Sequence, residues 1–160
     1  MTVADVMQVT VKSVPSEMPL SDLEQELVSA NVSGFPVVDD LKLVGVVSRS
    51  DIIRRICDER EVAQETSDFY FDEIGFHESK MKSLKDIADR VGERLESLTV
   101  CDVMANNPWT VRSSQKLSEA AKAFVDHRIH RLPVIEDQAL VGILTTMDLV
   151  QLISRRKLAR

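Results

Sequence analysis

Two stretches of the chain carry residue types that could hold a ribose phosphate. Residues 45–51 read Gly-Val-Val-Ser-Arg-Ser-Asp, and residues 142–148 read Gly-Ile-Leu-Thr-Thr-Met-Asp. In each stretch an apolar run leads into a hydroxyl and, three residues later, an aspartate, where the pattern predicts that a helix begins. A helix N-terminus offers backbone N–H groups to a phosphate, and a carboxylate accepts hydrogen bonds from the hydroxyls of a sugar. Ordinary helix capping uses the same residue types at the same positions, and it is the alternative interpretation.

An internal repeat places the two stretches at equivalent positions. A shift of 97 residues aligns residues 2–56 with residues 99–153 without a gap, and 18 of the 55 aligned pairs are identical. The chain therefore contains two copies of one structural unit. A single stretch favours capping, whereas the same pattern at the same point of both copies favours nucleotide binding.

Each copy has the pattern of a strand, a helix, two strands and a second helix. Val14 and Val111 lie in short extended segments, and the runs at 35–38 and 43–47 predict a hairpin. Ser21, with Glu24 three residues later, predicts a capping box at the start of the first helix. Apolar residues then recur at helical spacing in both copies, at Leu20, Leu23, Leu27 and Val28 and at Leu117, Ala120, Phe124 and Val125. A second helix is expected from Ser50 or Asp51, with its isoleucines at 52, 53 and 56 facing inward.

The repeat also predicts the domain organisation. We expect one domain at residues 1–56, a helical connector at 57–98, and a second domain with a C-terminal helix at 99–160. A unit of about 55 residues buries little surface by itself. We therefore expect an α+β fold in which the two copies pack through their sheets around a pseudo-twofold axis.

The connector has two interpretations. A helix is predicted from Ser83, with apolar residues at Leu84, Ile87, Val91, Leu95 and Leu98 on one face. The first interpretation is an arm folded over the module. The second is a dimer contact or a lid, because the aromatic residues Phe69, Tyr70, Phe71 and Phe76 need a surface to cover.

Composition argues against several classes of function. The net charge is -6, which argues against nucleic acid as a partner, and no apolar run reaches the length of about 18 residues that a membrane span needs. Cys57 and Cys101 lack metal-ligand spacing, as do the three histidines, so we expect no metal site, reduced thiols and a cytoplasmic location. Neither a nucleophile–histidine arrangement nor a phosphate-binding glycine loop is evident, so we expect no enzyme.

These motifs together resemble a known family. The sequence is similar to the paired cystathionine-beta-synthase (CBS) domains over residues 2–56 and 99–153. The resemblance rests on the Asp-Val-Met that opens each copy, on residues 34–39 and 129–135, and on the two Gly-to-Asp stretches. It implies symmetric clefts between two packed domains, a further pairing into a homodimer, and no catalysis. The ligand it implies is AMP, ADP or ATP, sometimes S-adenosylmethionine, whose binding tunes a partner protein.

The resemblance also implies roles for individual residues in the cleft of the second copy. By position, Asp148 would hold the ribose hydroxyls and Thr145 a phosphate oxygen. His130 and Arg131 match a pair that meets phosphate in the family, although a half-buried strand histidine is the alternative for His130. The adenine would be bordered by Thr110, Val111 and Pro133. Nearby, Trp109 could stack on a ligand.

The cleft of the first copy is expected to be the weaker phosphate site. Asp51 and Ser48 would take the same roles there as their counterparts in the second copy. The base would be surrounded by Ser13, Val14 and Pro36. Because Ser33 and Gly34 stand where the second copy has its His-Arg pair, only Arg49 beside Ser48 could supply a charge. The leading hypothesis is thus a regulatory sensor of adenine nucleotides, with an S-adenosylmethionine module or a purely structural dimerisation protein with empty clefts as alternatives.

Overall fold

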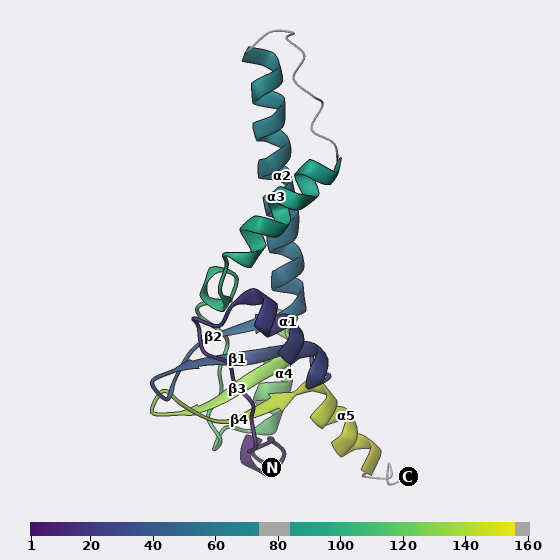
Figure 1. The fold of residues 1–160 in the computed structure, drawn as a ribbon. Helices are drawn as coiled ribbons and strands as arrows, with labels where there is room; N and C mark the ends of the chain where they lie inside the picture. The colour runs from purple at the N-terminus through teal and green to yellow at the C-terminus, as the bar shows by residue number, and fades with distance from the viewer. Residues whose placement is uncertain (74–83, 156–160) are drawn as a thin grey trace. The chain divides into compact units, whose positions relative to one another are not determined.

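The computed structural model describes residues 1–73 and 84–155 (Figure 1). Short 3₁₀ helices at Val3–Asp5 and Val100–Asp102 open the two copies. The other elements are α1 (Leu20–Ser29), β1 (Gly34–Asp39), β2 (Lys42–Ser48), α2 (Arg49–Glu73), α3 (Leu84–Glu96), α4 (Leu117–His127), β3 (Arg131–Glu136), β4 (Ala139–Thr145) and α5 (Thr146–Arg155). The helix, hairpin and helix of each copy follow one another as predicted, which confirms the mixed fold of two repeated units.

The chain divides into two compact units that both draw on the two copies. The first, which we call the sheet unit, comprises Met1–Pro15, Pro36–Val46 and Ala105–Arg160. The second, the helical unit, comprises Ser16–Phe35 and Val47–Met104. The domain boundaries predicted from the repeat, and the packing of the copies about a pseudo-twofold axis, stay predictions.

The sheet has the strand order β1-β2-β4-β3 in the described part of the chain. β3 and β4 pair antiparallel, from Arg131 opposite Thr145 to Glu136 opposite Ala139. The predicted extended segments add single parallel bridges, from Val14 to β1 and from Val111 to β3. Both hairpins turn through two residues with positive φ, Asp40 and Leu41 (47° and 65°) and Asp137 and Gln138 (46° and 70°). Positive φ at both central positions is what a type I′ turn requires, and this turn matches the twist of the strands that it joins.

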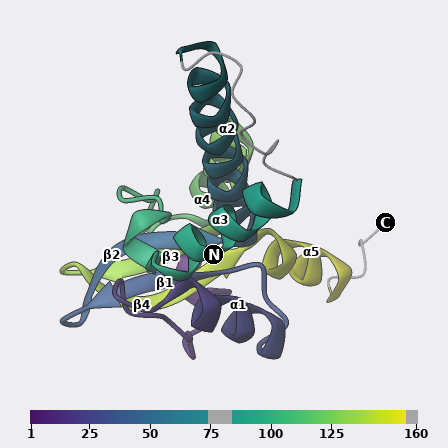
Figure 2. The same ribbon diagram turned by 45° about the horizontal axis from the view of Figure 1, so that its top comes forward.

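The core of the sheet unit lies between the sheet and α4. It contains Val3, Val111, Leu117, Ala120, Phe124, Leu132, Val134 and Leu144. Helix α4 packs against β3, and α5 follows directly from the end of β4 (Figure 2). The predicted apolar face of α4 is confirmed except at Val125, which is exposed. In the helical unit the corresponding prediction for α1 is likewise wrong at Val28 alone. Each of these valines directly follows a buried residue, so it lies about 100° round the helix from that residue.

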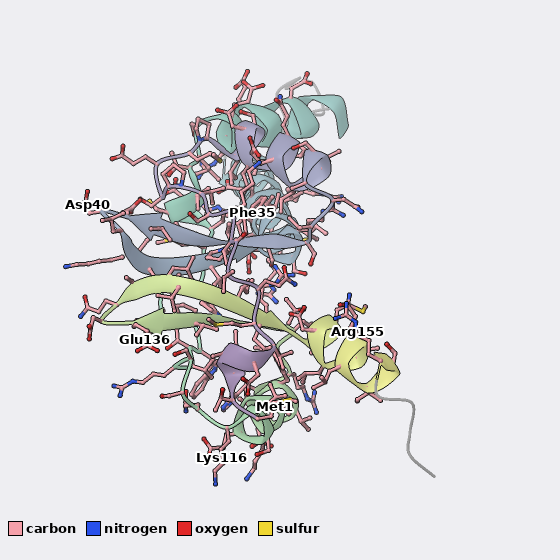
Figure 3. All side chains as sticks on the ribbon, turned by 90° about the horizontal axis from the view of Figure 1, so that it is seen from below. Met1, Phe35, Asp40, Lys116, Glu136 and Arg155 are labelled. Carbon is pink, nitrogen blue, oxygen red and sulfur yellow. The ribbon has the colours of Figure 1, made fainter. Side chains whose placement is uncertain are left out.

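The first helix of each copy starts with an N–H that donates to a backbone carbonyl from a distant segment, and neither helix has a side-chain cap. Helix α1 starts at Leu20, whose N–H donates to the carbonyl of Leu98 at 3.1 Å. Helix α4 starts at Leu117, whose N–H donates to the carbonyl of Met1 at 3.2 Å; Met1 and Lys116 lie close together in Figure 3. The prediction that Ser21 caps α1 is therefore wrong, because a distant carbonyl already satisfies the N–H at the start of the helix.

The second helix of the first copy is longer than expected, and it continues into the connector. Helix α2 begins at Arg49 and packs along α3 within the helical unit (Figure 1). The buried carboxylate of Glu59 forms ion pairs with Arg55 on its own helix, at 2.9 Å, and with Arg94 on α3. The prediction that Ile53 faces inward is wrong, because its side chain is 60% exposed on the solvent side of α2.

The described residues test only part of the connector prediction. A helix is present where the sequence predicted one, from Leu84 onward, and Val91 on its apolar face is buried. Ser83, Phe76 and the side chains of residues 69–71 lie outside what the structure describes. The connector's role as an arm, a dimer contact or a lid stays a prediction.

Candidate functional site

Asp148 lies at the junction between β4 and α5, and it caps the helix as the simpler interpretation predicted. Its Oδ2 accepts hydrogen bonds from the Thr145 N–H at 2.7 Å and from the Thr145 hydroxyl at 2.6 Å. Asp148 is only 8% exposed. A carboxylate this buried needs hydrogen-bond donors on both oxygens. Capping satisfies Oδ2, and the partner of Oδ1 decides what else the group can bind.

That partner is Gln8, a residue that the sequence did not single out. The Nε2 of Gln8 donates to Asp148 Oδ1 at 2.8 Å, although the two residues are 140 positions apart. The Gln8 N–H and carbonyl each bond to Ile143 on β4 at 2.9 Å, and this pairing brings the N-terminal segment alongside the junction. The repeat contained no signal for Gln8, because the equivalent position of the second copy is Ala105. Only the pairing of residue 8 with β4 reveals it.

The predicted phosphate residues begin the strand beside this junction. Arg131 is the first residue of β3 and pairs with Thr145, while the His130 carbonyl accepts the N–H of Thr146 at 3.1 Å. Arg131 is half-buried and His130 is exposed. The interpretation of His130 as a half-buried strand histidine is wrong, since it precedes the strand and faces solvent. The structure thus brings Asp148, Thr145, His130 and Arg131 to one end of the β3–β4 hairpin.

The residues predicted to border the adenine lie along the opposite edge of β3. The Val111 N–H donates to the Pro133 carbonyl at 3.1 Å, and the Ile135 N–H donates to the Val111 carbonyl at 2.9 Å. Thr110 and Val111 line a cleft of about 620 Å³, together with Arg112, Ser114, Gln115, Lys116, Glu119 and Ile135. That volume is in the range of small-molecule sites. The junction residues and Pro133 are not part of its lining, so the predicted site falls into two groups on either side of β3.

Trp109 and the loop after Val111 shape the surroundings of this cleft. Trp109 stacks on His127, with ring centroids 3.7 Å apart and planes inclined by 9°. One face of the indole is therefore occupied by the protein, and stacking on a ligand stays a prediction. Ser113 donates from its hydroxyl at 2.7 Å and from its N–H at 3.1 Å to Glu136. The hydrogen bond from the Ser113 hydroxyl lowers the pKa of Glu136 below its ordinary value of 4.5, and the weaker effect of the Ser113 N–H adds to this.

Replacing Ser113 by Ala is expected to destabilise the protein in a pH-dependent way. Because the pKa of Glu136 is lower in the folded state than in the unfolded state, its ionised form favours folding at pH values above about 4.5. This contribution disappears as the pH falls below that value and through the lower folded pKa. The loss in melting temperature caused by Ser113→Ala should therefore be larger at pH 7 than at pH 3 in thermal melts. An equal loss at both pH values would contradict this origin.

The junction of the first copy repeats the geometry within the helical unit. Asp51 Oδ2 accepts from the Ser48 N–H at 2.8 Å and from the Ser48 hydroxyl at 2.7 Å. Its Oδ1 lies 3.3 Å from Arg54. The guanidinium of Arg49 donates to the Leu27 carbonyl at 3.2 Å. The residues predicted around the base, Ser13, Val14 and Pro36, belong to the sheet unit. The first cleft therefore stays a prediction.

Among the residues whose side chains the structure describes, no cluster of three or more metal-binding groups is present. The thiols of Cys57 and Cys101 are free and exposed. No helix in the described segments has the length and apolar character to cross a bilayer. The predicted cytoplasmic location is not tested by these observations.

Comparison with known proteins identifies the family. The model of the CBS domain matches at residues 3–58 and again at 100–155, so the chain belongs to the CBS domain family and carries a tandem pair. An uncharacterised protein of Methanocaldococcus jannaschii is 31% identical over 75% of this chain and 72% of its own length. The chloroplastic CBS domain-containing protein CBSX1 of Arabidopsis thaliana is 32% identical over 78% of this chain, which spans only 51% of that relative.

Among solved structures, CBSX2 in complex with AMP resembles this chain. It has a TM-score of 0.69 and 26% identity, and the match covers 96% of both chains. CBSX2 thus binds AMP, and this chain has the same family of domains and a similar fold.

Proposed function

We propose that this chain is a non-catalytic regulatory module that binds an adenine nucleotide, AMP, ADP or ATP, at the junction of β4 and α5. The observation that carries the proposal is the buried Asp148 carboxylate in the first turn of α5. Just before it, Thr145 pairs with Arg131, and the N–H of Thr146 donates to the His130 carbonyl. The AMP complex of the similar CBSX2 supports an adenylate as the ligand class. Ligand binding would act on a partner protein through a change in conformation.

The proposed roles follow from the chemistry of each group. Asp148 accepts hydrogen bonds from the ribose hydroxyls, and the cationic Arg131 meets the phosphate. Both donors of Thr145, its N–H and its hydroxyl, are used on Asp148 in this structure, so we propose that Thr145 orients the carboxylate. The base lies against Thr110, Val111 and Pro133. The first copy offers Asp51, Ser48, Arg49, Ser13, Val14 and Pro36 for a second, weaker cleft. It is weaker because Ser33 and Gly34, which carry no charge, stand where the second copy has His130 and Arg131.

A thermal-shift panel followed by one substitution tests this function. A nucleotide at 100 times its Kd should stabilise the fold by about 2.7 kcal/mol, which corresponds to roughly 5–10 °C for a chain of this size. AMP, ADP, ATP and S-adenosylmethionine are compared with GTP and NAD. Replacing Arg131 by Ala should then weaken AMP binding by at least about 1.5 kcal/mol in calorimetric titrations, the lower end for a hydrogen bond to a charged group.

The exposed Lys122 on α4 provides a matched control for the loss of one positive charge. Lys122→Ala should leave the affinity unchanged. A loss below about 0.5 kcal/mol for Arg131→Ala would remove Arg131 from the site. If S-adenosylmethionine alone shifts the melting temperature, the alternative ligand replaces the adenine nucleotide. If no compound shifts it, the structural dimerisation protein is favoured, and turnover of any nucleotide would contradict the non-catalytic assignment.

A second copy of this chain is the partner that we propose for α5. Met147, Val150 and Ile153 are each more than half exposed and lie three residues apart, so they form one apolar face of the helix. Val150→Glu should therefore shift the sedimentation coefficient from that of a dimer to that of a monomer. The exposed Val125 on α4 is a matched control, because Val125→Glu makes the same change on a different helix. A monomeric wild type would exclude the homodimer.

A further inference from the structure

We propose that the side chain of Gln8 is a built-in competitor for the ribose-binding carboxylate of Asp148. This inference rests on the proposed function, and it concerns which ligands the site accepts and how tightly. In the structure the Gln8 amide donates to Asp148 Oδ1 at 2.8 Å, where a ligand hydroxyl would otherwise donate.

The acceptor capacity of the carboxylate makes the competition unavoidable. An ionised carboxylate offers about four lone-pair positions. In the described residues, Thr145 fills two of them with its N–H and hydroxyl, and Gln8 fills a third. About one position remains, whereas a vicinal diol needs two. A ribose can therefore bind fully only when the Gln8 amide leaves.

The structure gives the Gln8 side chain a route out. Its backbone is anchored to Ile143 by two hydrogen bonds, so the segment itself stays in place. Gln8 is exposed to solvent, whereas Asp148 is buried. The Gln8 amide can therefore rotate away and form hydrogen bonds with water instead. The buried carboxylate of Asp148 then needs another donor in its place. A ligand with two adjacent hydroxyls supplies that replacement, and a ligand with one hydroxyl can use the remaining position without displacing Gln8.

The two copies differ at this position, so the competitor belongs to one junction. The residue equivalent to Gln8 is Ala105, whose methyl group cannot donate a hydrogen bond. The substitution Gln8→Ala therefore gives the first copy the residue that the second copy already has at the equivalent position. The substitution should relieve the competition without adding any group to the site.

Calorimetric titration of AMP and 2′-deoxy-AMP into the full chain tests the inference. Gln8→Ala should bind AMP about three- to tenfold more tightly than the wild type, the range set by the net worth of one hydrogen bond. Affinity for 2′-deoxy-AMP should change less than twofold, so preference for the ribose form increases. The exposed Gln151 on α5 is the matched control, and Gln151→Ala should bind both ligands like the wild type.

The outcomes separate this inference from the function on which it rests. If wild type and Gln8→Ala bind AMP equally, or if Gln8→Ala binds it more weakly, the inference fails while the proposed function stands; weaker binding would mean that Gln8 contacts the ligand. If neither protein binds AMP, both fail. Gln8→Met, which keeps a long side chain but cannot donate, should reproduce the gain of Gln8→Ala, and a gain seen with alanine alone would overturn the competitor role.

Discussion

Replacing Asp148 by Asn is expected to weaken AMP binding about 100-fold without unfolding the protein. The asparagine has the same shape, and its carbonyl oxygen can still accept the Thr145 N–H that caps α5. It loses the negative charge that makes the hydrogen bonds from the ribose hydroxyls strong. Hydrogen bonds to charged groups are worth about 1.5–3 kcal/mol each. Weakening both hydrogen bonds from the two ribose hydroxyls therefore costs about 3 kcal/mol, which corresponds to two powers of ten in Kd.

Calorimetric titration measures this loss directly, and two substitutions serve as references. Asp126→Asn removes the same charge from the exposed surface of α4 and should leave the Kd unchanged. Asp51→Asn changes the equivalent junction of the first copy and should affect only the weaker of the two proposed sites. If Asp148→Asn binds AMP within threefold of the wild type, the carboxylate is a helix cap and nothing more.

Replacing Gly142 by Ala is expected to destabilise the fold by about 2–3 kcal/mol, because β4 has no room for a methyl group at this point. A Cβ built on Gly142 would lie 2.7 Å from Met7 Sδ and 3.0 Å from the carbonyl oxygen of Gln8. The thioether of Met7 can rotate away. The carbonyl of Gln8 cannot do so cheaply, because it accepts a hydrogen bond from Ile143 at 2.9 Å. The N-terminal segment would have to separate from the strand that it pairs with.

Urea denaturation provides the measurement, and the chain contains its own control. Gly92 lies in α3, and a Cβ there would meet no atom of the described residues within 4 Å. Gly92→Ala should therefore stabilise the protein by up to about 1 kcal/mol, because alanine favours a helix over glycine. A cost below about 0.5 kcal/mol for Gly142→Ala would show that residues 7 and 8 do not hold the position described against β4.

Local periodicity in the sequence is enough to predict a large part of the fold. The repeat, the presence of the hairpins and the buried positions of α1 and α4 follow from residue spacing, because alternation and helical period depend on neighbouring residues alone. The paired junctions at Asp51 and Asp148 are predictable for the same reason. Their hydrogen bonds run over three residues, to Ser48 and Thr145, and thus depend on local sequence.

Contacts between residues far apart in the chain decided the remainder. Ser21 does not cap α1, because the first N–H of that helix, from Leu20, donates to the carbonyl of Leu98. Gln8 reaches Asp148 across 140 positions, because the N-terminal segment pairs with β4. No spacing rule encodes such contacts, since a backbone carbonyl or an amide can come from any segment that packing brings near. Tertiary packing therefore determined which acceptor positions of the Asp148 carboxylate are already filled.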